Sequence, residues 1–285
     1  MGFFSSISQG FAFIREAFSM AFTKRKLLAP SVYLVCATIV YYVVWIAILI
    51  AADVALDSTA GYALEGAMVF GNFVIFYFFM GMTVNMIDVH LKGGEPSVGE
   101  AFADALKNVV AIVTLAGIST IVELVSKMAR RRGRGIAGLV GALLASIIEA
   151  VWTVVSFLLL PIIIIEDCSV GAALRRAKQI HRDNLLLIGI GAVGVRFALN
   201  LVSLVGFVLI FAVVYLAFTV LSGTAALVLA ILGGGTLLAL TAALQVFVRM
   251  AYYTCLYLWA VEVERVGGEA RAPAPLAAAM GVAGA

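Results

Sequence analysis

Charged residues are scarce in this sequence. They make up 12% of its 285 residues, whereas hydrophobic residues make up 64%. A soluble domain has roughly 25% charged and about 45–50% apolar residues, so this composition indicates a protein that is integral to a membrane. The net charge of +3 is ordinary for such a protein, because basic residues gather at the cytoplasmic membrane surface. It calls for no nucleic-acid partner.

Cysteine and histidine are also rare, which argues against an enzyme or a metal protein. The three cysteines are far apart, and His90 and His181 have no partners at ligand spacing. No Ser/His/Asp set or carboxylate pair is placed for catalysis. A G-x-G-x-x-G pattern at 189–194 lacks the acidic residue about twenty positions on that a dinucleotide fold needs. We therefore expect no catalytic residues, no cofactor and no metal.

Long apolar runs predict an all-α fold, a polytopic bundle with about six transmembrane helices. A bilayer core of roughly 30 Å needs about 20 apolar residues in a helix. The six predicted spans cover about 27–52, 66–87, 108–125, 135–161, the run 185–220, and the run 224–261 with a break at Gly233 to Gly235.

Three shorter segments have apolar residues three and four positions apart, which predicts amphipathic helices lying in the membrane interface. They cover residues 3–22, 97–107 and 169–182. The apolar stripe of the first consists of Phe11, Ile14, Phe18 and Phe22.

The amphipathic segments share a sequence pattern. Each opens with S-x-G-x-A, at Ser8, Ser97 and Ser169, and each is followed by two predicted spans. We interpret the chain as a single transmembrane domain, 1–265, built from three repeats of an amphipathic helix and a hairpin. The repeats cover about 5–95, 96–167 and 168–264, and a flexible tail covers 266–285.

The distribution of Lys and Arg predicts the orientation, because cytoplasmic segments carry an excess of basic residues. The clusters at 24–26 and 175–182 are basic, while the loop at 53–65 has neither Lys nor Arg. This places both termini inside, in a membrane of the bacterial inner type. The basic turn at 127–134 then lies outside, against the rule. A four-span protein with 108–165 folded back therefore stays an alternative.

A few charged residues lie within the predicted spans. Each would cost about 2.5–3.5 kcal/mol at the bilayer centre on insertion scales, so we expect them to pair or to line a polar path. The predicted intramembrane polar layer consists of Glu123, Glu149, Arg196, Asn200, Gln245 and Arg249. We expect Glu149 to be the counter-charge of Arg196, Arg249 or both, and Lys127 to hold Glu123 toward the outer surface.

Small residues recur every four positions in the first half of the fourth span. Such residues let another helix approach closely, which is how helices associate in lipid. The predicted helix-packing face consists of Ala137, Gly138, Gly141, Ala142, Ala145 and Ser146. Because Glu149 falls on the same face, we expect its side chain to point into protein.

Basic residues near the amphipathic helices predict contacts with lipid headgroups. Anionic lipids attract such residues at the cytoplasmic surface. The residues expected to make these contacts are Lys24, Arg25, Lys26, Arg175, Arg176, Lys178 and Arg182. Docking of a protein partner on the same helices is the alternative interpretation.

One region resembles a known group of proteins. Trp152, the sequence P-I-I-I-I-E at 161–166 and the following S-V-G-A-A-L-R-R-A from Ser169 are similar to a family of uncharacterised prokaryotic six-span membrane proteins. The similarity covers most of residues 5–262 and implies the topology given above; the family has no agreed activity. Mitochondrial carriers also have three two-span repeats, but their P-x-[DE]-x-x-[KR] signature is missing at the end of every odd span.

Together these observations predict a non-enzymatic membrane protein. The leading interpretation is a homo-oligomeric assembly that forms a channel or transport pathway, because charges within spans mark such paths. The alternative is a membrane scaffold that uses its amphipathic helices to bind lipid or recruit partners. A pathway predicts solute flux, whereas a scaffold predicts altered membrane shape or partner capture without flux.

Overall fold

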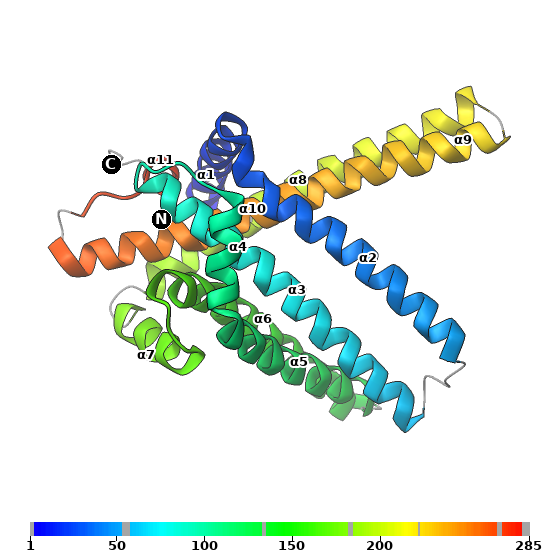
Figure 1. Ribbon diagram of the computed structural model, residues 1–285, viewed down its shortest axis with the longest axis horizontal. Coiled ribbons are helices and arrows are strands. Elements are labelled where there is room, and N and C mark those ends of the chain that lie inside the picture. Colours follow the sequence, from blue (N-terminus) through cyan, green and yellow to red (C-terminus); the bar gives the residue numbers. More distant parts are fainter. Residues whose placement is uncertain are drawn as a thin grey trace.

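The computed structural model describes the backbone of residues 3–52, 58–132, 135–181, 185–221, 223–266 and 270–280, and the side chains within 10–51, 58–130, 140–180, 199–221, 223–266 and 270–277. This part of the chain is helical almost throughout (Figure 1). In chain order the elements are α1 (Phe3–Thr23), η1 (Arg25–Leu28), α2 (Ala29–Ala52), α3 (Thr59–Leu91), α4 (Val98–Lys107), α5 (Val109–Arg132), α6 (Gly135–Glu166), α7 (Val170–His181), α8 (Leu185–Val220), α9 (Gly223–Leu229), η2 (Ala230–Gly234), α10 (Gly235–Val266) and α11 (Ala274–Met280).

Six of the described helices are long and apolar enough to cross a membrane, as the sequence predicts. They are α2, α3, α5, α6, α8 and the helix that α9, η2 and α10 form together. Large apolar side chains of α2, α8 and α10 remain exposed, and a helix that is apolar on all sides is typical of a membrane span. The protein is therefore an integral membrane protein, and the predicted all-α membrane bundle is confirmed.

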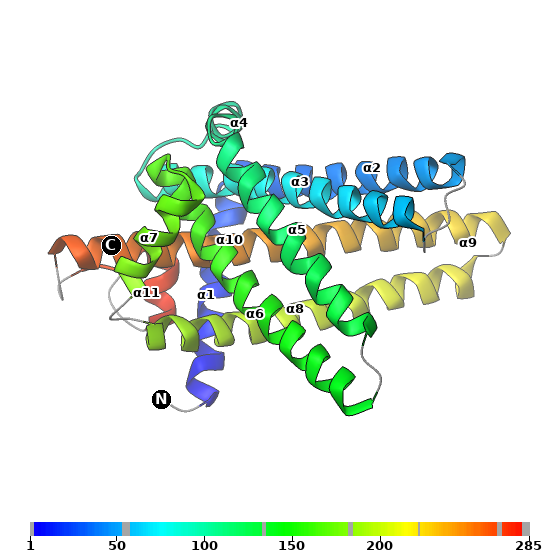
Figure 2. The ribbon, with the colours of Figure 1, turned by 90° about the horizontal axis from the view of Figure 1, so that it is seen from below.

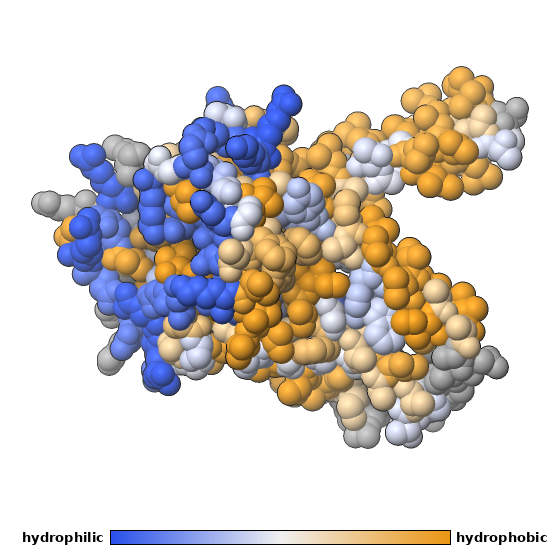
Figure 3. Space-filling view, viewed as in Figure 1, coloured by the Kyte–Doolittle hydropathy of each residue, from blue (hydrophilic) through white to orange (hydrophobic). Residues whose placement is uncertain are grey.

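The spans form three hairpins, α2–α3, α5–α6 and α8–α10, that meet at one end (Figures 1 and 2). The short helices α4, α7 and α11 lie toward that end, where hydrophilic residues cover the visible surface, while hydrophobic residues cover most of the remainder (Figure 3). We call this the polar end and the opposite ends of the hairpins the tips. Toward its tip, the α8–α10 hairpin diverges from the α2–α3 hairpin (Figure 1).

The core lies mainly toward the polar end, where α3, α6 and α10 pack together. Met80 and Met86 of α3, Leu160 of α6 and Phe247 of α10 are fully buried there. Lipid chains are as apolar as these residues, so the contacts stabilise the bundle through close packing and not through removal of apolar surface from water. Pro161 lies within α6, and the helix continues through it to Glu166.

The first amphipathic helix, α1, has two apolar sides. Of the predicted stripe, Ile14 is buried, whereas Phe11 and Phe22 are exposed. Phe13 and Ala17, which the prediction left out, are also buried. The reason is that α1 packs against α8 and α11. The side of α1 in this contact is buried, and Phe11 and Phe22 lie on the exposed side.

The predicted break at the three glycines was wrong. Residues 223–266 form one continuous helix, in which η2 has π-helical geometry. An interruption would leave backbone groups unsatisfied in an apolar medium, which is costly. The glycines instead allow close packing with α8, since a Cβ on Gly234 would lie only 3.3 Å from the side chain of Val214.

The prediction that 266–285 is a flexible tail was wrong for its middle part. Residues 274–280 form α11, which packs against α1 and α10. Leu276 and Ala277 are buried in this contact. The alanines that made this segment look unstructured are good helix formers with an apolar surface to cover. Residues 281–285 lie outside the described part of the chain.

Ion pairs at the polar end connect each interfacial segment with the end of the hairpin that follows it. The pairs are Lys24–Glu95 at 2.6 Å, Lys107–Asp167, and Arg176–Glu264 at 2.6 Å. Hydrogen bonds from Lys107 and Asn108 lower the pKa of Asp167, and the hydrogen bond from Lys24 lowers the pKa of Glu95. The three-repeat organisation stays a prediction, to which the structure adds that each predicted unit is closed by the same kind of pair.

Candidate functional site: a charged cluster within the spans

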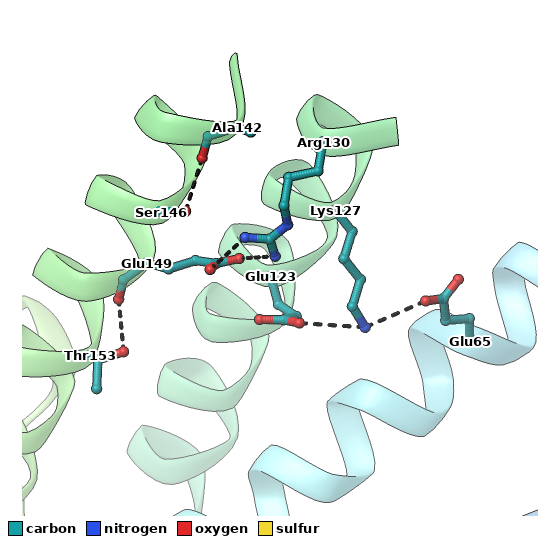
Figure 4. Close-up of polar contacts among 8 residues, drawn as sticks. All are labelled: Glu65, Glu123, Lys127, Arg130, Ala142, Ser146, Glu149 and Thr153. Carbon is teal, nitrogen blue, oxygen red and sulfur yellow. Dashed lines mark hydrogen bonds and ion pairs between the residues drawn. The ribbon is translucent and has the colours of Figure 1, made fainter. Parts of the chain in front are cut away.

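Five charged side chains from three helices gather toward the tips of α3, α5 and α6 (Figure 4). This charged cluster consists of Glu65, Glu123, Lys127, Arg130 and Glu149. Arg130 donates two hydrogen bonds to Glu149, from Nη1 to Oε2 at 2.8 Å and from Nη2 to Oε1 at 2.5 Å. Lys127 Nζ lies 3.4 Å from a carboxylate oxygen of Glu65 and 3.4 Å from one of Glu123.

Helix α5 carries three of the five residues. Glu123, Lys127 and Arg130 are four and three positions apart, which places them as neighbours along the helix surface. Because α5 packs along both α3 and α6, its two cations reach different helices. Lys127 extends to Glu65 of α3 and Arg130 to Glu149 of α6 (Figure 4).

Glu123 and Glu149 lie within the candidate spans, toward the tips. At the helical rise, Glu149 is about 26 Å from Glu166 and Glu123 about 21 Å from Val109, which places both in the half of a roughly 30 Å hydrocarbon core that is farther from the polar end. The five side chains nevertheless remain between 25% and 36% exposed. Charge exposed to lipid is costly. The pairing satisfies the charges in part, and their exposed atoms require water, headgroups or another protein chain.

The structure gives Glu149 a partner different from those predicted. We expected Arg196 or Arg249, and the structure shows Arg130, from the basic end of α5. Arg130 and Glu149 lie on the two helices of one hairpin and are close in sequence, so Arg130 is within reach of the Glu149 carboxylate. The guanidinium of Arg249 lies 5.4 Å from the ring centroid of Phe157, and the side chain of Arg196 lies outside the described residues.

The other members of the predicted polar layer lie in different environments. Lys127 does bind Glu123, as predicted. Gln245 on α10 is half-buried, and Asn200 on α8 is exposed. The described ion pairs therefore join Glu123 and Glu149 to the basic end of α5, and a layer shared with Arg196 and Arg249 stays a prediction.

The small residues of α6 divide between two environments. Gly141 and Ala145 face α5, since a Cβ on Gly141 would lie 3.5 Å from the carbonyl oxygen of Ala129 and Ala145 is buried. Ala142 is half-buried and Ser146 is exposed. The side chains of the remaining two predicted members, Ala137 and Gly138, lie outside the described residues. One row thus brings α5 and α6 together and the other remains open.

Sequence reasoning missed a buried polar group that joins the same three helices. Tyr77 of α3 and Trp152 of α6 both hydrogen-bond the hydroxyl of Ser119 on α5, at 2.8 and 2.9 Å. Ser119 in turn donates to the carbonyl oxygen of Leu115 at 2.9 Å. Nothing in the sequence of these apolar helices indicates that the tyrosine and the tryptophan share a hydrogen-bond partner. Only Trp152 was singled out, for its place in the resemblance.

The predicted headgroup contacts stay a prediction, and two of their residues also form ion pairs within the chain. Arg176 is bound by Glu166 and Glu264, with N–O distances of 2.6–2.9 Å. Lys24 is likewise bound by Glu95. The predicted residues with exposed side chains are Arg25, Lys26, Arg175 and Lys178, and Arg182 lies outside the described residues.

The charged cluster is a set of ion pairs and is not arranged as a metal site. Its three carboxylates are each held by a lysine or an arginine, which occupy the oxygens that a metal would need. Within the described ranges, no three His, Cys, Asp or Glu side chains are grouped as a metal site requires. That the protein works without a metal or cofactor stays a prediction.

A family model matches residues 59–268, which contain α3 to α10 and all five residues of the charged cluster. Its description is a family of unknown function, DUF6159. The chain belongs to this family. Membership in DUF6159 confirms the predicted resemblance to an uncharacterised family of membrane proteins. No curated protein and no solved structure matches the chain.

Proposed function

We propose that this protein is a homo-oligomeric assembly that forms a channel or transport pathway for an ion or small polar solute, without enzymatic activity. The observation that carries the proposal is the charged cluster, five ionisable groups on three spans with exposed atoms at membrane depth. Charges in spans typically face a water-filled cavity or the interior of an assembly. A path through or between subunits supplies such surroundings.

The two halves of the cluster suit different roles. The bidentate Arg130–Glu149 pair has short hydrogen bonds of 2.5 and 2.8 Å, which favours a fixed structural pair. Lys127 is shared between two carboxylates at 3.4 Å each. Those longer contacts are weaker, so an entering ion can compete with them. The pathway therefore runs along the Lys127 side, with Arg130–Glu149 holding α5 and α6 in place.

The open row of small residues on α6 supports assembly of several copies. Ser146 and Ala150 are exposed on a helix that otherwise presents large apolar side chains. Small residues four apart allow a second helix to approach closely. A second copy at this row would also cover part of the neighbouring charged cluster. We place the assembly in a bacterial-type inner membrane with both termini inside.

Flux through reconstituted liposomes tests the proposal. We expect the wild-type protein to raise ion flux above that of protein-free liposomes, and Glu123→Gln to change its rate or charge selectivity several-fold. Glu95→Gln is the matched control, because it removes a carboxylate that is also paired with a lysine but lies at the polar end. Absence of flux from correctly folded protein, or equal effects of both variants, contradicts the pathway.

A membrane scaffold is the second candidate, favoured by the exposed Arg25, Lys26, Arg175 and Lys178 near the polar end. Such residues attract anionic lipid and acidic partners. A scaffold predicts that anionic vesicles change shape when the protein is added and that no flux accompanies this change. Removing these four charges together should abolish the effect on the vesicles.

A further inference from the structure

An open pocket of about 640 Å³ lies where α3 and α10 end and the chain enters α11. His90 and Lys92 line it from the end of α3, and Arg271 lines it from the segment before α11. Its volume is within the roughly 300–1,000 Å³ range of small-molecule sites. None of these residues belongs to the charged cluster or to the predicted headgroup contacts.

The charge of the pocket favours an anion. Its lining carboxylate, Glu262, is bound by Arg265 through hydrogen bonds of 3.0 and 2.8 Å, so its negative charge is balanced within α10. The charge of Lys92 is likewise balanced by Asp88, at 2.7 Å, so the net positive charge comes from Arg271. Lys92 can still donate to a ligand, because its side chain is 62% exposed and an ammonium group has three donors. Arg271 is exposed and adds a guanidinium, which matches the geometry of phosphate oxygens.

The position of the pocket and its apolar lining residues favour an amphiphilic ligand. Helices α3 and α10 end at the pocket, α3 at Leu91 and α10 at Val266, so it lies at the polar end of the bundle, beside the ends of two apolar spans. Leu91 and Leu258 give it an apolar wall. A lipid approaching along the spans would present its glycerol and upper chains to this wall and its headgroup to the basic side chains.

We infer that this pocket binds the phosphate headgroup of an anionic phospholipid. Bound there, the phosphate would bridge α3 and the segment that leads into α11. This segment has a defined position, because Ala272 and Leu276 are buried and α11 packs against α1. The inference does not depend on the pathway, since a scaffold or a transporter could each hold such a lipid.

The test uses full-length protein in detergent and titrates short-chain phosphatidylglycerol, phosphatidylcholine and free glycerol phosphate, with binding followed by native mass spectrometry. We expect phosphatidylglycerol to bind at least tenfold more tightly than the other two probes. Arg271→Gln should weaken its binding about fivefold, the effect of one cation near an anionic headgroup. Arg15→Gln removes an exposed arginine that lies outside the pocket and outside the predicted headgroup contacts, and it should change binding less than twofold.

Three results overturn the inference. Equal binding of phosphatidylglycerol and phosphatidylcholine shows that charge is not recognised. Equal effects of Arg271→Gln and Arg15→Gln show general attraction to the surface and not a pocket. Glycerol phosphate that binds as tightly as the lipid assigns the site to a soluble phosphate compound. Because Arg271 is exposed, its replacement leaves folding intact, and a circular dichroism spectrum matching the wild type confirms this.

Discussion

Arg130 and Glu149 form the tightest contact of the charged cluster, and their contribution can be measured directly. We expect Glu149→Gln to lower the free energy of unfolding by up to about 1 kcal/mol, because it removes the charge of a bidentate pair whose side chains remain partly exposed. A double-mutant cycle with Arg130→Gln, measured by unfolding in detergent, should show a favourable coupling energy between the two side chains. Additive losses would mean that the pair contributes nothing. Arg175→Gln, on the exposed side of α7, is the control.

The stability of the fold depends on pH through Asp167, at the polar end. Lys107 and Asn108 lower its pKa in the folded protein, so the carboxylate stabilises the fold above its unfolded pKa of about 3.9. That contribution is lost as the pH falls through the lower folded pKa. Since the side chain is 41% exposed, the gain at neutral pH is below about 1 kcal/mol.

Asp167→Asn isolates this charge, because the backbone of Asp167 has a φ of +50° and asparagine accepts that conformation well. We expect the wild type to be more stable than Asp167→Asn at pH 7 and the difference to narrow as the pH falls below about 4 toward the lower folded pKa of Asp167. Thermal unfolding at pH 7, 5 and 3.5 measures it. A difference that persists unchanged at pH 3.5 would assign the effect to shape and not to charge.

At the scale of elements, the packing of α5 against α6 depends on Gly141. A Cβ there would meet a backbone oxygen at ordinary contact distance, so Gly141→Ala should be tolerated. Gly141→Leu has no room and should cost about 1–3 kcal/mol through overpacking. The matched control is Ser146→Leu on the exposed row of the same helix, which should leave monomer stability unchanged. If both leucine variants unfold alike, α5 does not depend on this face.

The same pair of variants separates packing within one chain from assembly. Ser146→Leu should reduce the size of the assembly in detergent if the open row contacts a second copy, whereas Gly141→Leu acts first on the hairpin itself. Size-exclusion chromatography with light scattering distinguishes the two. An assembly that keeps its size in Ser146→Leu places the contact between copies elsewhere.

The helices themselves could be predicted because their signals are local. Apolar runs of sufficient length fix the spans, and the predicted 97–107 and 169–182 closely match α4 and α7. The partner of Glu149 could not be predicted, because depth along a helix does not say which neighbour is near, and the closer Arg130 was assigned to the outer surface. The tail was misjudged because α11 exists through its contact with α1, a surface formed only by the fold.

For the whole molecule, orientation across the membrane is the property that labelling can measure. Single cysteines in a background without native cysteines, introduced as Ser58→Cys, Arg132→Cys and Lys178→Cys, should divide into two groups. An impermeant maleimide should label positions 58 and 132 in intact cells, and position 178 only after permeabilisation. Labelling of position 132 from inside would favour the four-span alternative, in which 108–165 do not reach the other side.

The divergence of the hairpins determines how much area the protein occupies at different depths. The α8–α10 hairpin separates from the α2–α3 hairpin toward the tips (Figure 1), while the charged cluster joins α3 to α5 there, so the molecule is wider toward the tips than at the polar end. Lipid chains would fill the space between these two hairpins in a membrane, because the exposed side chains of α2 and α8 are largely apolar. Lateral pressure at that depth would then act on the angle between the hairpins, and a more crowded membrane would change the shape of this protein without any ligand.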